Sequence, residues 1–147
     1  MPKIRQLNKA DLPSCAKLYV LAFNAEPWND KWTAKAALQR LIDVYKTPRF
    51  YGIVCTENSK IIGALLGNVE WWYEKRHFNL KEMYIDPLHQ RRGLGSAMIK
   101  RLRSDIMKQE VIGIYLSTST MSWTSKFYLK NGFKTMKNMQ MMNAKLE

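Results

Sequence analysis

The chain has 147 residues, 46% hydrophobic and 24% charged, which is ordinary for a single globular domain. No apolar run of about 18 residues occurs, so the composition excludes a membrane-spanning helix and we expect no membrane partner. Lysine and arginine number 24 against 12 acidic residues, giving a formal net charge of +12 that attracts anionic ligands. We therefore expect one domain over residues 1–147.

The basic excess is compatible with nucleic-acid binding or with a solvated basic surface that attracts an anionic cofactor. The basic residues are spread along the chain and no nucleic-acid motif occurs, so we expect no specific nucleic-acid partner. The N-terminal segment MPKIRQLNKADL lacks the apolar centre of a secretory signal, which predicts a cytoplasmic location.

Cysteine and histidine give no sign of a metal or redox centre. Cys15 and Cys55 lack the spacing of metal or redox motifs and are interpreted as small buried hydrophobic residues. His77 and His89 are isolated, and we interpret both as surface or loop histidines. The sequence therefore predicts no metal site.

Hydrophobic periodicity and turn residues predict alternating helices and strands with no internal repeat or linker. In chain order they are a strand (4–7), a helix that Asn8 or Asp11 caps and that ends near Ala22, a loop (23–32), a helix (33–45), three strands (50–56, 61–72 and 78–85), a helix from residue 94, a strand (111–117), a helix (122–130) and a final strand or hairpin (133–145). In the long strand, Gly63 and Gly67 predict bulges or a close backbone approach.

The stretch 78–102 combines a strand, a glycine-bearing loop and the start of an amphipathic helix. From Leu94 onward an apolar residue recurs every four positions, with basic residues between, which indicates one buried and one exposed helix face. Gly93 and Gly95 lie where the loop becomes the helix, so backbone N–H groups can point outward there. A helix start carries unpaired N–H donors and a partial positive charge, so this loop predicts a site for a phosphorylated ligand.

The spacing of the glycines shows which known type of phosphate-binding loop this sequence matches. A P-loop requires Gly-Lys-Ser/Thr after a glycine and four residues, and that run is absent. A dinucleotide fingerprint requires glycine or alanine three residues after Gly95, where this chain has Met98. The run at 90–95 is instead Gln-Arg-Arg-Gly-Leu-Gly. This Gln/Arg-x-x-Gly-x-Gly/Ala pattern resembles the acetyl-CoA loop of the GNAT superfamily of N-acetyltransferases.

Two further segments extend the resemblance. The run Met-Tyr-Ile-Asp-Pro at 83–87 is similar to the strand that the family places before its loop. The run Phe-Tyr-Leu-Lys-Asn-Gly-Phe at 127–133 resembles the family's second signature, Phe-Tyr-x-x-x-Gly-Phe. The predicted order of elements matches the GNAT fold across nearly the whole chain. The resemblance therefore implies an α+β fold, with a mixed, mostly antiparallel central sheet and helices on both faces.

The resemblance implies an acetyl-CoA-dependent N-acetyltransferase without a metal. Acetyl-CoA would donate the acetyl group, with its pantetheine arm along the strand and its pyrophosphate on the loop. The cofactor-binding residues implied by the signatures are Met83, Tyr84, Ile85, Gln90, Arg91, Arg92, Gly93, Leu94, Gly95, Ser96 and Lys130. Neither cysteine lies in a nucleophile signature, so we expect direct transfer in a ternary complex.

Acetyl transfer to an amine requires removal of an ammonium proton and protonation of the departing thiolate. Tyr128 aligns with the tyrosine that the family commonly uses as general acid, although it could also be a core or rim tyrosine. Glu82 is the candidate base, because it shares a strand face with Tyr84 and is the only carboxylate between Glu74 and Asp86. A strand glutamate can equally face water or pair with a lysine, so that alternative stays open.

Two acidic-aromatic clusters are candidates for binding the amine acceptor. Glu26 and Trp28 lie in the first interhelical loop, and Trp71 and Trp72 lie near the end of the long strand. Aromatic faces with nearby carboxylates suit a cationic amine, whereas packing of the tryptophans against the core is an equally good explanation. The acceptor is a small amine, an aminoglycoside-like polyamine, or a protein lysine or N-terminus. The alternative function is a non-catalytic CoA-sensing or nucleic-acid-binding module, and the chain can be a monomer or a homodimer.

Overall fold

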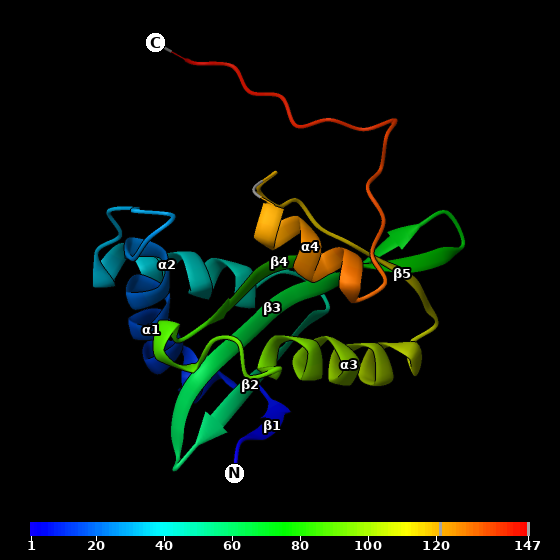
Figure 1. The fold of residues 1–147 in the computed structure, drawn as a ribbon. Helices are drawn as coiled ribbons and strands as arrows, with labels where there is room; N and C mark the ends of the chain where they lie inside the picture. Colours follow the sequence, from blue (N-terminus) through cyan, green and yellow to red (C-terminus); the bar gives the residue numbers. More distant parts are fainter. Residues whose placement is uncertain (121, 147) are drawn as a thin grey trace. The chain divides into compact units, whose positions relative to one another are not determined.

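A computed structural model describes residues 1–120 and 122–146 of the chain (Figure 1). The chain forms two compact units, Met1–Tyr115 and Leu116–Glu147, which we describe separately. Whether they act as the single domain expected from the sequence stays a prediction. No helix in the described ranges is long and apolar enough to cross a membrane.

The first unit contains a five-stranded sheet in the order β1-β2-β3-β4-β5. The strands are β1 (Lys3–Gln6), β2 (Phe50–Glu57), β3 (Lys60–Trp72), β4 (Lys75–Ile85) and β5 (Val111–Tyr115). Neighbouring strands are antiparallel from β1 to β4, and only β5 runs parallel to its neighbour. The prediction of a mixed, mostly antiparallel sheet in an α+β fold is confirmed.

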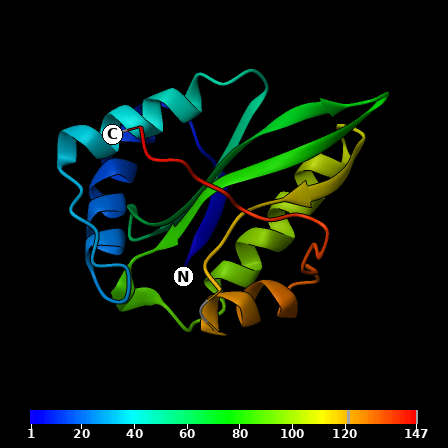
Figure 2. The same ribbon diagram turned by 90° about the horizontal axis from the view of Figure 1, so that it is seen from above.

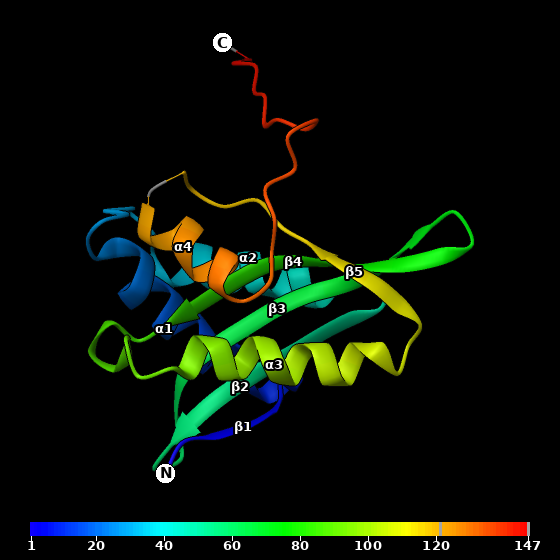
Figure 3. The same cartoon turned by 45° about the vertical axis from the view of Figure 1, so that its right-hand side comes forward.

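Helices cover both faces of this sheet, as the sequence predicts. They are α1 (Leu12–Asn24), α2 (Ala34–Tyr45) and α3 (Leu94–Met107), with short 3-10 helices at Lys9–Asp11 and Pro87–His89. Figures 2 and 3 show α1 and α2 on one side of the sheet and α3 on the other. The core between α1, α2 and the sheet includes Val54, Ala64 and Leu66, whereas Met98 of α3 lies against Gly63 on the opposite face.

The helix starts follow from local capping chemistry. Asn8 accepts a hydrogen bond from the N–H of Ala10 (3.1 Å), and Asp11 accepts one from the N–H of Asn8 (2.9 Å). This reciprocal capping box begins the 3-10 turn that leads into α1. Thr33 caps α2 through the N–H of Ala36 (3.0 Å). The predicted capping residues thus fix where the first two helices begin.

A β-bulge lies in the middle of the β3–β4 ladder. Leu66 pairs with Glu82 and Gly67 pairs with Leu80, so Lys81 is the extra residue on β4. At Gly67 the two backbones approach closely, because a Cβ added there would overlap the carbonyl oxygen of Asn79. The glycine therefore confirms the close approach that the sequence predicts, and the bulge lies directly beside Glu82.

We expect Gly67→Ala to lower the free energy of unfolding by about 1–3 kcal/mol, because overpacking a filled core forces backbone and side chains apart. The added methyl group would also lie 2.6 Å from Phe78 Cζ. Denaturant unfolding measures the change. The control is Gly113→Ala, whose Cβ would meet only the ring of Tyr115 at 3.3 Å. Equal losses in the two variants would contradict the close approach at Gly67.

Strand β5 accompanies β4 over only part of its length. The pairing runs from Arg76 with Val111 to Asn79 with Tyr115, where β5 ends, whereas β4 continues to Ile85. The pairing of β4 with β5 therefore ends just before the segment of β4 that carries Glu82. Strand β4 then leads into the glycine loop. The stretch of β4 from Leu80 to Ile85 therefore has no β5 residue paired with it.

The second unit contains one helix, α4 (Ser122–Lys130), among its described residues. Gly132 ends it with a left-handed φ of 88°. The N–H groups of Gly132 and Phe133 bond back to Leu129 (3.1 Å) and Tyr128 (3.0 Å). This is the usual geometry of a helix that stops at glycine. The glycine of the second sequence signature therefore has a structural role.

The predicted final strand or hairpin at 133–145 is wrong: no strand occurs among the described residues beyond β5. The segment is exposed, including Met136, Met139, Met141 and Met142. It alternates apolar and polar residues, but methionine lacks the β-branching that favours strands. Without a paired neighbour, its backbone has no ladder to join.

Candidate active site

The loop between β4 and α3 has the backbone geometry of a phosphate-binding turn. Arg91 and Gly93 both adopt left-handed conformations, with φ of 63° and 77°. Gly93 is the N-cap of α3, and a Cβ placed on it would meet no atom within 4 Å. The first helical hydrogen bond runs from Ala97 to the carbonyl of Gly93 (3.1 Å). Residues 94–96 therefore present first-turn N–H groups that have no acceptor within the helix, beside open space.

The side chains of the predicted loop residues are tied to their surroundings. Arg92 donates two hydrogen bonds to Glu57 at the end of β2 (3.0 and 3.3 Å). Gln90 donates to the carbonyl of Ile85 (3.2 Å), and Asp86 accepts from the N–H of Leu88 (3.0 Å). The loop is thus fastened at both ends, and its backbone rather than the Arg92 side chain is the group available to a phosphate.

Glu82 is a buried carboxylate, with 6% of its surface exposed. Its Oε1 accepts a hydrogen bond from Arg40 Nε of α2 (2.5 Å) and one from the Tyr19 hydroxyl of α1 (3.5 Å). Burial raises the pKa of Glu82 above its ordinary value, while Arg40 and Tyr19 oppose that rise. Glu82 therefore neither faces water nor pairs with a lysine, but pairs with Arg40, and its role as base stays a prediction.

Tyr84 shares the Glu82 face of β4, as the two-residue period predicts. Its hydroxyl donates to the carbonyl of Cys15 (2.9 Å), and its ring packs against Tyr19 and Phe23 at 5.2 and 5.7 Å. The side chain therefore belongs to the core under α1. Any contact of this residue with a cofactor must use its backbone. Met83 and Ile85 point to the other face of the strand and are half-buried.

Both cysteines are free and buried, as the sequence predicts. Burial raises the pKa of the Cys15 thiol to about 12 and also raises that of Cys55. A thiol with a raised pKa stays protonated at neutral pH and is a poor nucleophile. Neither cysteine therefore suits a covalent acyl-enzyme step. Within the described ranges, no group of three metal-ligating side chains lies close enough to hold a metal ion.

Tyr128 and Lys130 both lie on α4 in the second unit, with Lys130 at its last position. The Tyr128 ring packs against Phe127 (5.0 Å) and Phe133 (5.4 Å), the other aromatic residues of the second signature. Burial raises the pKa of Tyr128 to about 12, so the phenol keeps its proton at neutral pH. A retained proton is what a general acid requires.

The two predicted acceptor clusters lie far apart. Glu26 is exposed in the α1–α2 loop, and the half-buried Trp28 ring lies 5.8 Å from Phe23, near the end of β4. Trp71 and Trp72 lie at the opposite end of the β3–β4 ladder, close to its hairpin, and are both exposed. Tyr84, which contacts Phe23, lies nine positions along β4 from Lys75 at the hairpin, or about 30 Å. One small acceptor cannot touch both clusters.

Trp71 and Trp72 also face opposite sides of the sheet, because successive strand residues alternate. Trp71 is stacked under the Arg76 guanidinium at 4.5 Å. Trp72 lies on the same face as Leu66, the residue that pairs with Glu82. Of the two tryptophans, only Trp72 shares a face with the candidate base.

Sequence analysis missed several neighbours of these groups. Arg40 and Tyr19 were not identified as partners of Glu82, although the apolar positions of α2 place Arg40 beside its buried stripe. The interpretation of His77 as a surface or loop residue is wrong. His77 lies in β4 with 13% of its side chain exposed, 3.4 Å from Glu70. No local pattern signals these pairs, because the partners come from different elements.

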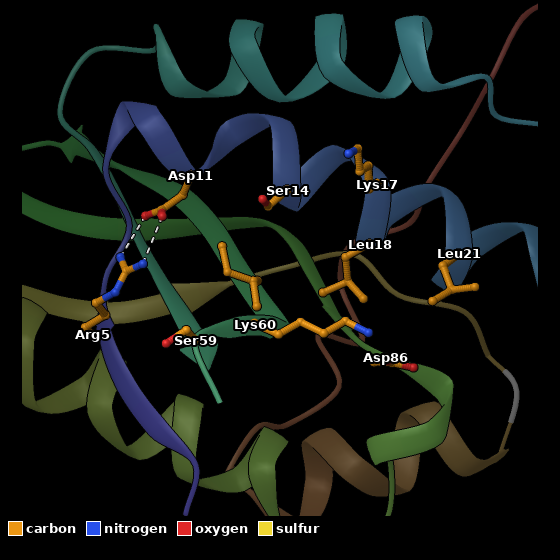
Figure 4. A pocket seen from close by; sticks show the side chains of 10 residues that line it. Arg5, Asp11, Ser14, Lys17, Leu18, Leu21, Ser59, Lys60 and Asp86 are labelled. Atoms are coloured by element: carbon orange, nitrogen blue, oxygen red, sulfur yellow. Dashed lines mark hydrogen bonds and ion pairs between the residues drawn. The ribbon is translucent and has the colours of Figure 1, made fainter. Parts of the chain in front are cut away.

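A separate open pocket of about 540 Å³ lies between α1 and the β2–β3 turn (Figure 4). Its polar lining includes Lys17, Lys60 and the Arg5–Asp11 pair, whose two hydrogen bonds measure 2.8 and 2.9 Å. No predicted catalytic, cofactor-binding or acceptor-binding residue lines it. The pocket is therefore distinct from the candidate site.

The order of elements and the glycine loop between β4 and α3 define the class of acyltransferases that the sequence signatures indicate. Residues 48–135 match the family model described as an acetyltransferase (GNAT) domain. Because the match covers more than half of the chain, the chain belongs to the GNAT family of acetyltransferases. No protein of curated function matches the sequence significantly.

Solved structures with similar folds include enzymes and a protein of another class. The aminoglycoside acetyltransferase meta-AAC0020 from an uncultured soil metagenomic sample, solved with sisomicin, is 21% identical with a TM-score of 0.78, covering 99% of this chain and 97% of its own. Aminoglycoside N-acetyltransferase AAC(6')-Iy, solved with CoA, is 15% identical with a TM-score of 0.77, covering 98% and 95%. A transcriptional regulator from Bacillus halodurans C-125 is 14% identical with a TM-score of 0.79, covering 98% and 100%. Identities this low support the fold alone.

Proposed function

We propose that the protein transfers an acetyl group from acetyl-CoA to a primary amine by direct attack in a ternary complex. The observation that carries this proposal is the pair of left-handed residues, Arg91 and Gly93, that opens the start of α3 to a ligand. These two residues follow the end of β4, a stretch of that strand with which β5 no longer pairs. A phosphorylated ligand can bind the loop amides while an extended arm follows the strand.

The loop fits the pyrophosphate of CoA in shape and charge. The space beside Gly93 is open, and residues 94–96 offer backbone N–H groups at the positive end of a helix dipole. Backbone groups of Met83 and Ile85 are the proposed contacts of the pantetheine arm. Arg91 and Lys130 would add positive charge, while Arg92 would act mainly by holding the loop through Glu57.

The proposed chemistry assigns one proton transfer to each of two residues. Glu82 takes a proton from the bound ammonium, directly or through water, so that the nitrogen lone pair can attack the thioester carbon. A backbone N–H of β4 stabilises the oxyanion as the C–N bond forms. When the C–S bond breaks, the Tyr128 hydroxyl donates its proton to the departing thiolate. As the intermediate collapses, the attacking nitrogen, which is cationic once the C–N bond has formed, loses its second proton to water. The products are the acetylated amine, CoA and one net proton, because Glu82 returns its proton to solvent and Tyr128 regains one from it.

The acceptor class is proposed from the chemistry of the site and from the similar structures. A buried carboxylate on a sheet face beside aromatic rings suits an amine, and two of the structurally similar proteins are described as aminoglycoside acetyltransferases. A small amine, a polyamine or a protein amine remain the candidates. A regulatory, non-catalytic role on this fold is the alternative, and the similar transcriptional regulator is its one point of support. The cytoplasmic location stays a prediction.

A transfer assay tests the proposal. Purified protein is incubated with acetyl-CoA and a panel of monoamines, polyamines, aminoglycosides and lysine peptides, and free CoA thiol is measured. We expect thiol release that depends on one amine class and acetylated product by mass spectrometry. Thermal stabilisation by acetyl-CoA without turnover of any amine would favour a CoA sensor, and no stabilisation would reject the cofactor.

The loop itself is tested with two nearly isosteric variants. Aspartate and asparagine both tolerate a left-handed φ better than most residues, so Gly93→Asp and Gly93→Asn carry similar backbone strain. We expect the aspartate to weaken CoA binding about tenfold to a hundredfold relative to the asparagine, because its charge repels phosphate. Calorimetry with CoA measures both. Equal affinities would place the phosphates elsewhere.

A further inference from the structure

A cluster of aromatic side chains surrounds one carboxylate where β3, β4 and β5 lie side by side. The His77 ring is 4.6 Å from that of Tyr115 and 5.4 Å from that of Trp72. The two outer rings remain accessible, with 53% of Trp72 and 40% of Tyr115 exposed. Three strands thus combine to present aromatic faces to solvent around Glu70.

Asn79 and His77 orient the Glu70 carboxylate. Asn79 Nδ2 donates to its Oε1 (3.1 Å), and His77 Nε2 lies 3.4 Å from its Oε2. No lysine or arginine within residues 1–120 and 122–146 forms an ion pair with Glu70, although its side chain is only 40% exposed. Its negative charge is therefore held in place beside aromatic rings without an ion pair to lysine or arginine among the described residues.

Basic side chains near the cluster bond elsewhere or are exposed, and Arg49 Nε donates to the carbonyl of Val69 (2.8 Å). Arg76 stacks on Trp71 at 4.5 Å, on the opposite face of the sheet. Lys75 shares the face of Trp72 but is exposed at the hairpin. The buried Nδ1 of His77 has no hydrogen-bond partner among the described residues. The cluster therefore has a carboxylate without a lysine or arginine partner and a ring nitrogen without a hydrogen-bond partner among the described residues.

This cluster lies on the face of the sheet that carries the candidate base. Leu66 pairs with Glu82, and Glu70 is four residues further along β3, which keeps the same face. At about 3.3 Å per residue, the two carboxylates belong to strand positions roughly 13 Å apart. That separation is larger than a monoamine and suits the spacing of amines in a linear polyamine or in linked amino sugars.

We propose that Glu70, Trp72, His77 and Tyr115 form a subsite for a remote ammonium group of the acceptor, whose reacting amine lies at Glu82. The acceptor is then a polycation rather than a monoamine. Aromatic faces attract an ammonium ion through the ring quadrupole, and the oriented carboxylate supplies the opposite charge. This inference rests on the proposed acetyl transfer for its role, but binding at the subsite can be measured without it.

Calorimetry with spermine, on the full chain without acetyl-CoA, tests the subsite directly. We expect Glu70→Gln to weaken spermine binding about tenfold, while the amide keeps the shape of the carboxylate. Tyr115→Leu should weaken it further in the same direction. The control is Glu74→Gln, which removes the same charge at the hairpin but outside the cluster. It should change the affinity less than twofold. Equal effects of the two glutamine variants, or no spermine binding by the wild type, would overturn the proposal.

Kinetics separate this inference from the proposed function. With a polyamine acceptor, Glu70→Gln should raise KM about tenfold and leave kcat unchanged, whereas a propylamine KM should not change. Equal KM changes for both amines would overturn the subsite. If no amine is acetylated but spermine binding still depends on Glu70, the transferase proposal fails and the cation site stands.

Discussion

Replacing Tyr128 by phenylalanine is expected to lower kcat by about a hundredfold to ten-thousandfold while leaving acetyl-CoA affinity unchanged. The substitution removes the hydroxyl but keeps the ring that packs against Phe127 and Phe133. Because burial raises the pKa of Tyr128 to about 12, the wild-type phenol is protonated across the neutral pH range. It can therefore donate its proton to the thiolate as the thiolate forms. Steady-state kinetics with a good acceptor, together with calorimetry, measure both quantities.

Tyr73→Phe is the matched control for this prediction. Tyr73 is 88% exposed in the β3–β4 hairpin, so loss of its hydroxyl should leave kcat unchanged. Full kcat in Tyr128→Phe would mean that the tyrosine is structural and that the thiolate leaves unassisted or through water. A fall in kcat that is accompanied by a large fall in the free energy of unfolding would also assign the tyrosine a structural role.

The parts of the fold that were predictable are those encoded by neighbouring residues. The Asn8 and Thr33 caps, the period-four apolar stripe of α3 and the helix at 122–130 are all local, and each is found at the expected residues. The glycine loop belongs to the same class, since Gly93 lies where the sequence predicts that the loop becomes the helix, and it takes there the left-handed conformation that glycine tolerates. Local chemistry was therefore enough to place the candidate cofactor loop.

Features that depend on tertiary register were not predictable in the same way. Glu82 meets Arg40 from 42 residues away in sequence. Residues 133–145 have a strand-like alternation but gain no partner strand, and the pattern alone cannot supply one. Likewise, the sequence makes Trp28 and Trp72 equal candidates for the acceptor site. Trp28 lies beside Phe23 near the end of β4, however, whereas Trp72 lies next to the β3–β4 hairpin. Which side chains share a site is decided by strand pairing and helix docking.

The second large prediction concerns Glu82, the carboxylate that pairs with Arg40. Glu82→Gln removes the candidate base, and we expect kcat/KM to fall about a hundredfold to ten-thousandfold at low pH. The defect should shrink as pH rises toward the pKa of the amine, because more acceptor is then already deprotonated. A pH profile identical in shape to that of the wild type would place the base elsewhere, with Glu26 or an ordered water as the next candidate.

Arg40 should control the pH at which Glu82 becomes active. A base works only when ionised, so the acidic limb of kcat/KM reports the Glu82 pKa. Burial raises that pKa and Arg40 opposes the rise. Removing the guanidinium in Arg40→Ala should therefore raise the pKa further and move the limb to higher pH. Arg40→Lys keeps a positive charge and should restore most of the shift. Tyr19→Phe removes only a 3.5 Å hydrogen bond and should move the limb least. If the limb stays fixed in all three variants, the arginine is a structural partner and Glu82 does not set the rate.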